Sequence, residues 1–253
     1  MQALIHHGAK KYRVDFCCPL DISIPLKPGE KNVNAFFSPP FEATPVVAGT
    51  FTGLVEAGSP VNFQNIRLNP HGNGTHTECV GHITAEKFTV NQCLKNFFFM
   101  AELVSVVPVQ TENGDTLILR EQIEKLLGAK RPEALVLRTL PNDAMKLSRN
   151  YSGENPPYLH HALADYLVAI GVKHLLVDLP SVDREQDEGR LLFHKAFWQY
   201  PDDIRKNSTI TELIYVPDEV KDGTYLLNLQ IASFELDAGP SKPVLYLLAQ
   251  VAD

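Results

Sequence analysis

The chain has little positive charge, few cysteines and no long apolar segment. Asp and Glu number 30 against 23 Lys and Arg, and no cluster of basic residues offsets the net charge of −7, so nucleic acid is not an expected partner. The most apolar short run, residues 97–101, is far too short to span a bilayer, and we expect no membrane association. No C-x-x-C pair or apolar leader is present, which favours a reducing, cytoplasmic location; the cysteines are Cys17, Cys18, Cys79 and Cys93.

A hydrophobic content of 44% and a length of 253 residues are sufficient for one complete core. No internal repeat, low-complexity tract or long linker divides the chain. We therefore expect a single domain over residues 1–253, with residues 1–15 as a peripheral terminal segment.

The distribution of apolar residues predicts an α/β fold of mixed architecture. Helices are expected over 116–127 and 157–170, each ended by a glycine. The proline-rich stretch 18–60 predicts short strands and irregular loops suited to a pocket mouth. Strands are expected at 97–109, 134–138, 173–178, 209–216, 224–231 and 244–249.

Residues 71–82, His-Gly-Asn-Gly-Thr-His-Thr-Glu-Cys-Val-Gly-His, carry most of the functional information. Imidazole and carboxylate groups are the usual ligands of a catalytic transition-metal ion where thiolates are absent. Thr75 to Glu78 reads as extended, so His76 and Glu78 would point to the same face and could converge on one ion. Glycines at 72 and 74 let His71 turn toward the same point, and His82 could serve as a ligand or an acid/base. The alternative is a polar loop whose histidines only form local hydrogen bonds.

Two further residues are polar in apolar surroundings. His194 lies beside Phe193, Ala196, Phe197 and Trp198, where an imidazole needs a partner. Glu212 stands within a predicted buried strand, where an ionised carboxylate is costly unless it is paired or metal-bound. Each of them alone could equally be a hydrogen-bonded core group.

Other candidates are assigned ordinary roles. Asp178 is expected to be a structural residue at a strand end. The acidic run Asp183, Glu185, Asp187 and Glu188 is expected to be a solvated loop, which could lie near the pocket because it precedes His194. His160 and His161 are expected at a helix start, His174 at a strand entry, and Phe36, Phe37 and Phe41 in the core rather than in the pocket wall.

Several motifs in this order resemble the cyclase-like metal-dependent hydrolases, which include bacterial kynurenine formamidase (arylformamidase) and isatin hydrolase. The family pattern of His, Gly-Thr-His-x-Asp and a further His is similar to the segment from His71 to His82. Over about residues 20–250, further similar segments are Asp21-Ile-Ser23, Gly171-Val-Lys173, Asp178-Leu-Pro-Ser-Val-Asp183, His194-Lys-Ala196 and Thr211-Glu-Leu213.

The resemblance implies a fold with a mixed, β-barrel-like core flanked by helices, in a homodimer or homotetramer. It implies His71, His76 and Glu78 on a first divalent metal ion, Glu78 bridging to a second ion held by His194 and Glu212, and His82 as general acid/base. Zinc is expected first and manganese second, with one or two ions bound.

Two departures from the family pattern stand out. Glu78 replaces the family's aspartate and is one methylene longer. Asn73 adds one residue between His71 and His76. The longer loop and the longer side chain could compensate each other, or they could change the number of metal ions or the shape of the pocket.

The function expected is hydrolysis of a small amide, most simply an aryl formamide such as N-formylkynurenine, through attack by metal-bound hydroxide with Glu78 and His82 as catalytic residues. An isatin-like cyclic amide is the alternative within the family. Three alternatives lie outside metal-dependent amide hydrolysis. They are a non-catalytic family member that binds a metabolite, a cupin-type iron oxygenase, and an enzyme that uses the Cys79 thiol as nucleophile.

Overall fold

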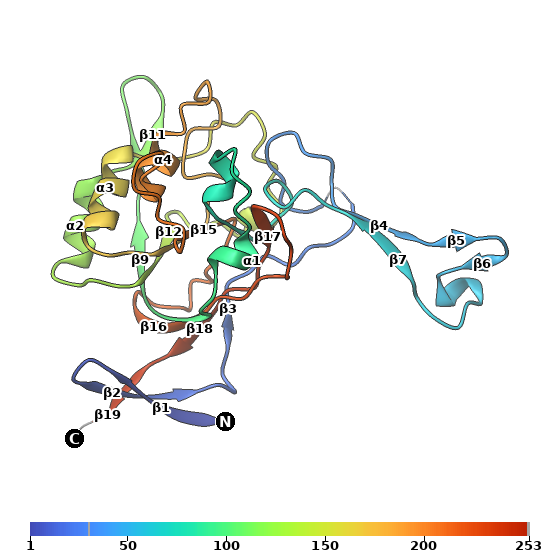
Figure 1. Cartoon of the computed structure of the whole chain (residues 1–253), viewed down its shortest axis with the longest axis horizontal. Helices are drawn as coiled ribbons and strands as arrows, with labels where there is room; N and C mark the ends of the chain where they lie inside the picture. Colours follow the sequence, from blue (N-terminus) through green and yellow to red (C-terminus); the bar gives the residue numbers. More distant parts are fainter. Residues whose placement is uncertain (30, 252–253) are drawn as a thin grey trace.

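The fold is organised around one large mixed sheet, as seen in the computed structural model, which describes residues 1–29 and 31–251 (Figure 1). Within these residues, nine strands are hydrogen-bonded in a continuous order. That order is β17 (Ala238–Pro240), β8 (His76–Glu78), β15 (Thr209–Glu212), β14 (His174–Val177), β12 (Ala134–Thr139), β9 (Phe98–Val106), β16 (Gly223–Asn228), β18 (Val244–Leu247) and β3 (Leu20–Asp21). The six predicted strands are therefore all present, most of them a few residues shorter than expected.

The centre of the sheet is parallel, from β9 through β12 and β14 to β15. Strand β12 is buried along its whole length, because its side chains alternate between two apolar clusters. Leu135 and Leu137 pack toward helices α2 (Arg120–Leu127), α3 (His161–Ala169) and α4 (Leu192–Trp198). Ala134 and Val136 pack on the opposite face. The predicted α/β class is confirmed.

The second face of the sheet is buried because the sheet curls. One cluster joins side chains from strands far apart in the sheet order, including Leu176 of β14, Tyr225 of β16 and Leu245 of β18. Such a cluster requires the strands to wrap around a common interior, which gives the barrel-like core expected from the family resemblance.

Both predicted helices begin later in the chain than expected. Residues 116–118 form β11 (Thr116–Ile118), which pairs with β10 (Val109–Gln110) and β13 (Tyr158–Leu159). The β-branched residues at 116 and 118 and the prolines at 156 and 157 favour this extended pairing over a helix. Helix α3 starts only after His160, whose side chain caps the helix by accepting a hydrogen bond from the backbone of Ala162.

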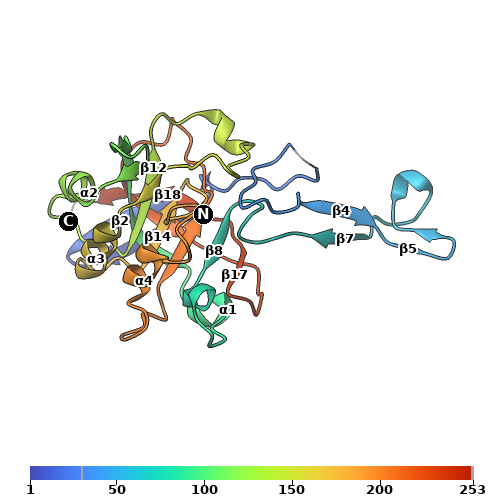
Figure 2. The same cartoon turned by 90° about the horizontal axis from the view of Figure 1, so that it is seen from above.

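A long arm leaves the body of the molecule between residues 42 and 67 (Figures 1 and 2). It is built from β4 (Glu42–Pro45) paired with β7 (Gln64–Arg67), and β5 (Val47–Ala48) paired with β6 (Phe51–Thr52), with a 3₁₀ turn at Val55–Ala57. The prediction of a pocket mouth over 18–60 is therefore wrong for residues 42–60, which point away from the core. It holds for Phe36 and Ser38, which line a cavity.

The chain ends meet in a small peripheral sheet, in which β2 (Lys10–Asp15) pairs with both β1 (Gln2–His7) and β19 (Ala249–Val251). Figure 1 shows this sheet below the main body. No helix in the described ranges is long and apolar enough to cross a membrane. The remaining elements are α1 (Val90–Cys93) and two 3₁₀ helices at Val80–Ile83 and Ala144–Leu147.

Candidate metal centre

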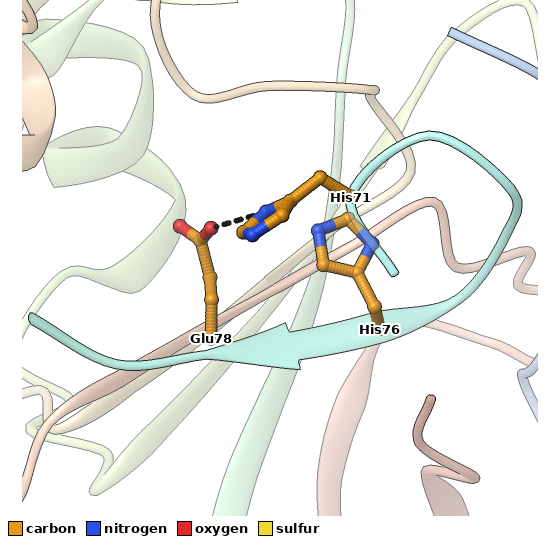
Figure 3. Close-up of side chains that lie close together, drawn as sticks. All are labelled: His71, His76 and Glu78. Atoms are coloured by element: carbon orange, nitrogen blue, oxygen red, sulfur yellow. Dashed lines mark ion pairs between the residues drawn. The ribbon is translucent and has the colours of Figure 1, made fainter. Parts of the chain in front are cut away.

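Strand β8 brings the first two site residues to one face, as its two-residue period predicts. His76 and Glu78 both extend from this strand toward the imidazole of His71 (Figure 3). The antiparallel register with β15 places Glu212 directly opposite His76, and residues paired in this way lie on the same face of a sheet. Glu212 Oε2 consequently lies 3.4 Å from His76 Nε2. The His76 Nδ1 group donates to the carbonyl of Gly74 at 2.9 Å, which leaves Nε2 directed at the site.

His71 reaches the site from the loop that precedes β8. Its Nδ1 lies 3.2 Å from Glu78 Oε2, the contact drawn as a dashed line in Figure 3. The loop turns at Gly74, whose φ of +142° is rarely adopted by a residue with a side chain. At Gly72 a Cβ atom would lie only 2.2 Å from the Ser38 hydroxyl oxygen, so glycine permits this close approach.

His194 enters from helix α4, and its Nε2 lies 3.1 Å from Glu78 Oε1. Its Nδ1 donates to Asp183 Oδ2 at 2.6 Å. Burial alone would lower the pKa of His194, but the hydrogen bonds to Asp183 and Glu78 raise it to about 10. The same contact with His194 holds the pKa of Asp183 below its usual value, against the effect of burial.

His82 lies in the 3₁₀ helix after β8 and is the most exposed of the four site histidines, with 31% of its side chain accessible. Its Nε2 is 3.8 Å from Glu78 Oε2. It borders a cavity of about 300 Å³ that is also lined by Phe36, Leu191 and Arg184. A group in this position can touch both the buried carboxylate and a small molecule in the cavity.

The charges at the centre are strongly coupled. Burial opposes ionisation of Glu78, yet the neighbouring His82 and His194 hold the pKa of this carboxyl well below its usual value. His71 loses solvent on burial, but its hydrogen bond with Asp237 and the charge of the nearby Glu78 carboxylate raise its pKa to about 10. Without a metal ion, the buried Glu78 carboxylate is thus compensated by protonated imidazoles.

The donor set fits a divalent cation. His76 Nε2 and Glu78 Oε2 are fully buried, and among the described residues neither has a hydrogen-bond partner. Buried polar atoms without partners are rare, and the ability to bind a cation would explain these two. Ligand atoms of His71, His76 and Glu78 lie within 4.8 Å of one another, as do those of Glu78, His82 and His194. Imidazole and carboxylate are ligands that zinc and other transition metals accept. All five predicted metal-ligating residues and His82 therefore gather at one place.

Two carboxylates at the site are not among the predicted site residues. Asp183 belongs to the run interpreted as solvated, but it is buried and hydrogen-bonded to His194, so that interpretation is wrong for this residue. Its position directly after the apolar Val182 was the available signal. Asp237 contacts both His71 and His82, and nothing in its local sequence marks it.

Several other assignments are settled by burial and contacts. Asp178 is structural, because it accepts hydrogen bonds from Lys146 and the backbone of Thr139. His174 is a core residue, whose pKa is lowered to about 3 mainly by burial. The expected core role is wrong for Phe36, which borders the cavity, and for Phe37, which is 74% exposed.

Cys79 does not face the site. It is fully buried against Val90 and Cys93, and the hydrogen bond with Cys93, together with burial, raises the pKa of its thiol. A thiol that ionises with such difficulty is a poor nucleophile, so the thiol-nucleophile alternative loses its basis.

Comparison with known proteins agrees with this fold. Residues 20–184 match the Cyclase family, described as "Putative cyclase". The chain belongs to the Cyclase family. This membership and the parallel strands at the centre of the sheet exclude the cupin-type alternative, because a jelly roll is built from antiparallel strands.

Solved structures similar to this Cyclase-family chain share its fold over nearly the whole length. A predicted metal-dependent hydrolase from Bacillus stearothermophilus is 16% identical with a TM-score of 0.64, over 90% of this chain and 98% of the other. An isatin hydrolase bound to the product analogue thioisatinate is 14% identical with a TM-score of 0.64, over 90% and 92%. Isatin hydrolase A from Labrenzia aggregata, bound to benzyl benzoate, is 12% identical with a TM-score of 0.65, over 91% and 93%.

Proposed function

We propose that this chain is a metal-dependent amidohydrolase that cleaves a small aryl amide, most simply an aryl formamide such as N-formylkynurenine. The observation that carries the proposal is the buried cluster in which His76 Nε2 and Glu78 Oε2 have no hydrogen-bond partner among the described residues. His71, His76 and Glu78 would hold a first divalent ion, and Glu78, His194 and Glu212 a second. Zinc is the first candidate and manganese the second.

A bound divalent cation would polarise a substrate carbonyl and lower the pKa of water toward neutrality. The side chains supply the remaining functions. His82 lies between Glu78 and the cavity, where it can pass a proton to the departing amide nitrogen; proton transfer of this kind is worth roughly 10²- to 10⁴-fold in rate. Phe36 and Leu191 give the cavity apolar wall for an aryl ring. An anilide nitrogen leaves more readily than an alkyl amine, which favours an aryl formamide.

The test is hydrolysis of N-formylkynurenine by purified protein, first stripped with a chelator and then reloaded with Zn²⁺ or Mn²⁺. We expect activity only after reloading, and a fall of roughly 10²- to 10⁴-fold in His82→Ala with unchanged metal content. His161→Ala, which alters an exposed histidine far from the cluster in sequence, is the matched control and should keep full activity. Metal-loaded protein that binds the amide without cleaving it would support the non-catalytic alternative instead.

A cyclic aryl amide is the second candidate. Structural similarity to isatin hydrolases, one of them bound to thioisatinate, favours it. Assaying isatin beside N-formylkynurenine with the same metal-loaded sample would rank the two by kcat/KM.

We also propose that the chain forms a homodimer or homotetramer through its arm, whose exposed apolar side chains include Val47, Phe63 and Ile66. Residues 42–67 contain only three charged residues, so two chains of net charge −7 would meet there with little repulsion. Light scattering should report an oligomer, and Phe63→Lys should shift it toward monomer. Leu4→Lys, at an equally exposed position in the terminal sheet, is the control.

A further inference from the structure

Asp237 lies at the edge of the cluster without belonging to the proposed ligand set. Its Oδ2 atom is 2.9 Å from His71 Nε2 and 3.3 Å from His82 Nδ1, so a single carboxylate oxygen contacts two site histidines. The two imidazole rings are also close to each other, with centroids 4.3 Å apart and planes inclined by 31°.

The backbone holds Asp237 firmly in this place. It precedes β17, whose first residue, Ala238, is paired with Glu78 of β8. The Asp237 carbonyl accepts a hydrogen bond from the backbone of Cys79 at 3.0 Å. At Gly81 a Cβ would lie 3.3 Å from Asp237 Cβ and 2.1 Å from the Phe88 carbonyl oxygen, so glycine allows the two segments to approach closely.

We propose that Asp237 is a positioning residue that fixes the ring orientation and tautomer of both His71 and His82. A carboxylate accepts hydrogen bonds, so the nitrogen facing Asp237 carries the proton in each neutral ring. With a cation bound, His71 would offer it the free Nδ1 lone pair on the side of Glu78, the arrangement in which a carboxylate orients a metal-ligating histidine. His82 presents Nε2 toward Glu78 and the cavity, where a proton acceptor is needed. Asp237 thereby couples the proposed metal site to the proposed acid/base, and this coupling rests on the proposed function.

The decisive variants are Asp237→Ala and Asp237→Asn, with Glu235→Gln as matched control. Glu235 lies on the same segment, but its carboxylate contacts Thr89 and Asn91 rather than the cluster. Asp237 is 36% exposed, so its truncation is compatible with folding. Because asparagine retains an oxygen acceptor, Asp237→Asn should keep part of the zinc affinity and of the histidine tautomer preference that Asp237→Ala loses.

The first readouts are independent of catalysis. Nitrogen-15 NMR of the imidazoles in the zinc-loaded protein should report Nδ1-protonated His82 and Nε2-protonated His71 in the wild type and in Glu235→Gln. Asp237→Ala should give a tautomer mixture at His82 and weaken zinc binding by roughly 10- to 100-fold without changing its stoichiometry. Wild-type tautomers and affinity in Asp237→Ala would overturn the proposal, and so would loss of a whole zinc ion, which would make Asp237 a ligand.

The kinetic readout tests the coupling to His82. At saturating zinc, Asp237→Ala should lower kcat by about 10-fold or more with little change in KM, and should have no further effect in a His82→Ala background. Additive losses in the double variant would contradict a role exerted through His82. If the wild type cleaves no amide, the proposed function fails, while the NMR and zinc measurements still decide the role of Asp237.

Discussion

Asp183 is expected to have two separable roles, one in stability and one in metal binding. Its Oδ1 accepts the backbone N–H of Phe193 at 2.8 Å, and its Oδ2 accepts that of His194 at 3.1 Å, so the carboxylate satisfies the first amides of helix α4. Oδ2 also accepts a hydrogen bond from His194 Nδ1 at 2.6 Å, which directs Nε2 toward Glu78.

Asp183→Ala removes all three hydrogen bonds and leaves two buried backbone donors without partners. Each such donor costs about 1–3 kcal/mol, so the free energy of unfolding should fall by roughly 2–6 kcal/mol. For a chain of this size each kcal/mol lowers the melting temperature by about 2–4 °C. Asp183→Asn keeps an oxygen acceptor at the helix start and should lose only the charge-assisted part, on the order of 1 kcal/mol.

Metal binding separates the two roles. Both Asp183 oxygens are used, whereas asparagine has only one oxygen. If that oxygen accepts from the helix amide, the Nδ2 group faces His194 Nδ1 and no longer favours the tautomer that presents Nε2, so both variants should bind zinc about 10- to 100-fold more weakly. Thermal denaturation of the metal-free protein and competitive zinc titration measure the two effects. Glu188→Gln, at an 83% exposed position in the same loop, should change neither. Wild-type zinc affinity in a destabilised Asp183→Ala would refute the metal role and leave only the helix cap.

Three further predictions concern proton release on zinc binding, the pH dependence of stability and a buried ion pair. His71 and His194 have pKa values of about 10 in the metal-free protein, so zinc binding at pH 8 should release about two protons, and zinc affinity should rise with pH. Titration calorimetry in buffers of different ionisation enthalpy measures this release. A binding enthalpy that does not depend on the buffer would contradict the prediction. Because these values exceed the ordinary 6.5, the metal-free protein should be stabilised fully below pH 6.5 and lose this stabilisation as the pH rises through 10, as denaturant titrations would measure. Lys146→Met leaves the fully buried Asp178 carboxylate uncompensated and should lower the free energy of unfolding by about 3–5 kcal/mol, as measured by chemical denaturation. Lys173→Met breaks an exposed ion pair and should lower it by at most about 1 kcal/mol.

Local pattern is sufficient to predict the parts of this protein that local physics determines. His76 and Glu78 share a face because a strand has a period of two, and β12 is recognisable because a strand buried on both faces is apolar throughout. Glu212 and His194 are identifiable because they are polar residues in apolar stretches of sequence. In the structure both lie at the candidate metal centre, where Glu212 is near His76 and His194 contacts Glu78.

Long-range pairing accounts for what the sequence did not reveal. Asp237 lies 155 residues beyond His82, and only the register between β17 and β8 brings the two together. Strand β11 could not be distinguished from the first turn of a helix, because its stability comes from pairing with β13, about 40 residues later. In both cases the deciding contact lies outside the window from which a periodicity is read.

The two departures from the family pattern are physically linked in the folded chain. Asn73, which the family resemblance marks as an additional residue, is buried; its Oδ1 accepts the backbone N–H of Asn69 at 2.6 Å and its Nδ2 donates to the Pro39 carbonyl at 2.9 Å. The insertion is thus a fixed part of the loop that carries His71. Glu78 reaches one methylene further than aspartate, and with this loop its Oε2 lies 3.2 Å from His71 Nδ1 while Oε1 contacts His194. Because one side chain sets both contacts, a shorter carboxylate would require the loop and helix α4 to move together, and the longer residue is consistent with the longer loop.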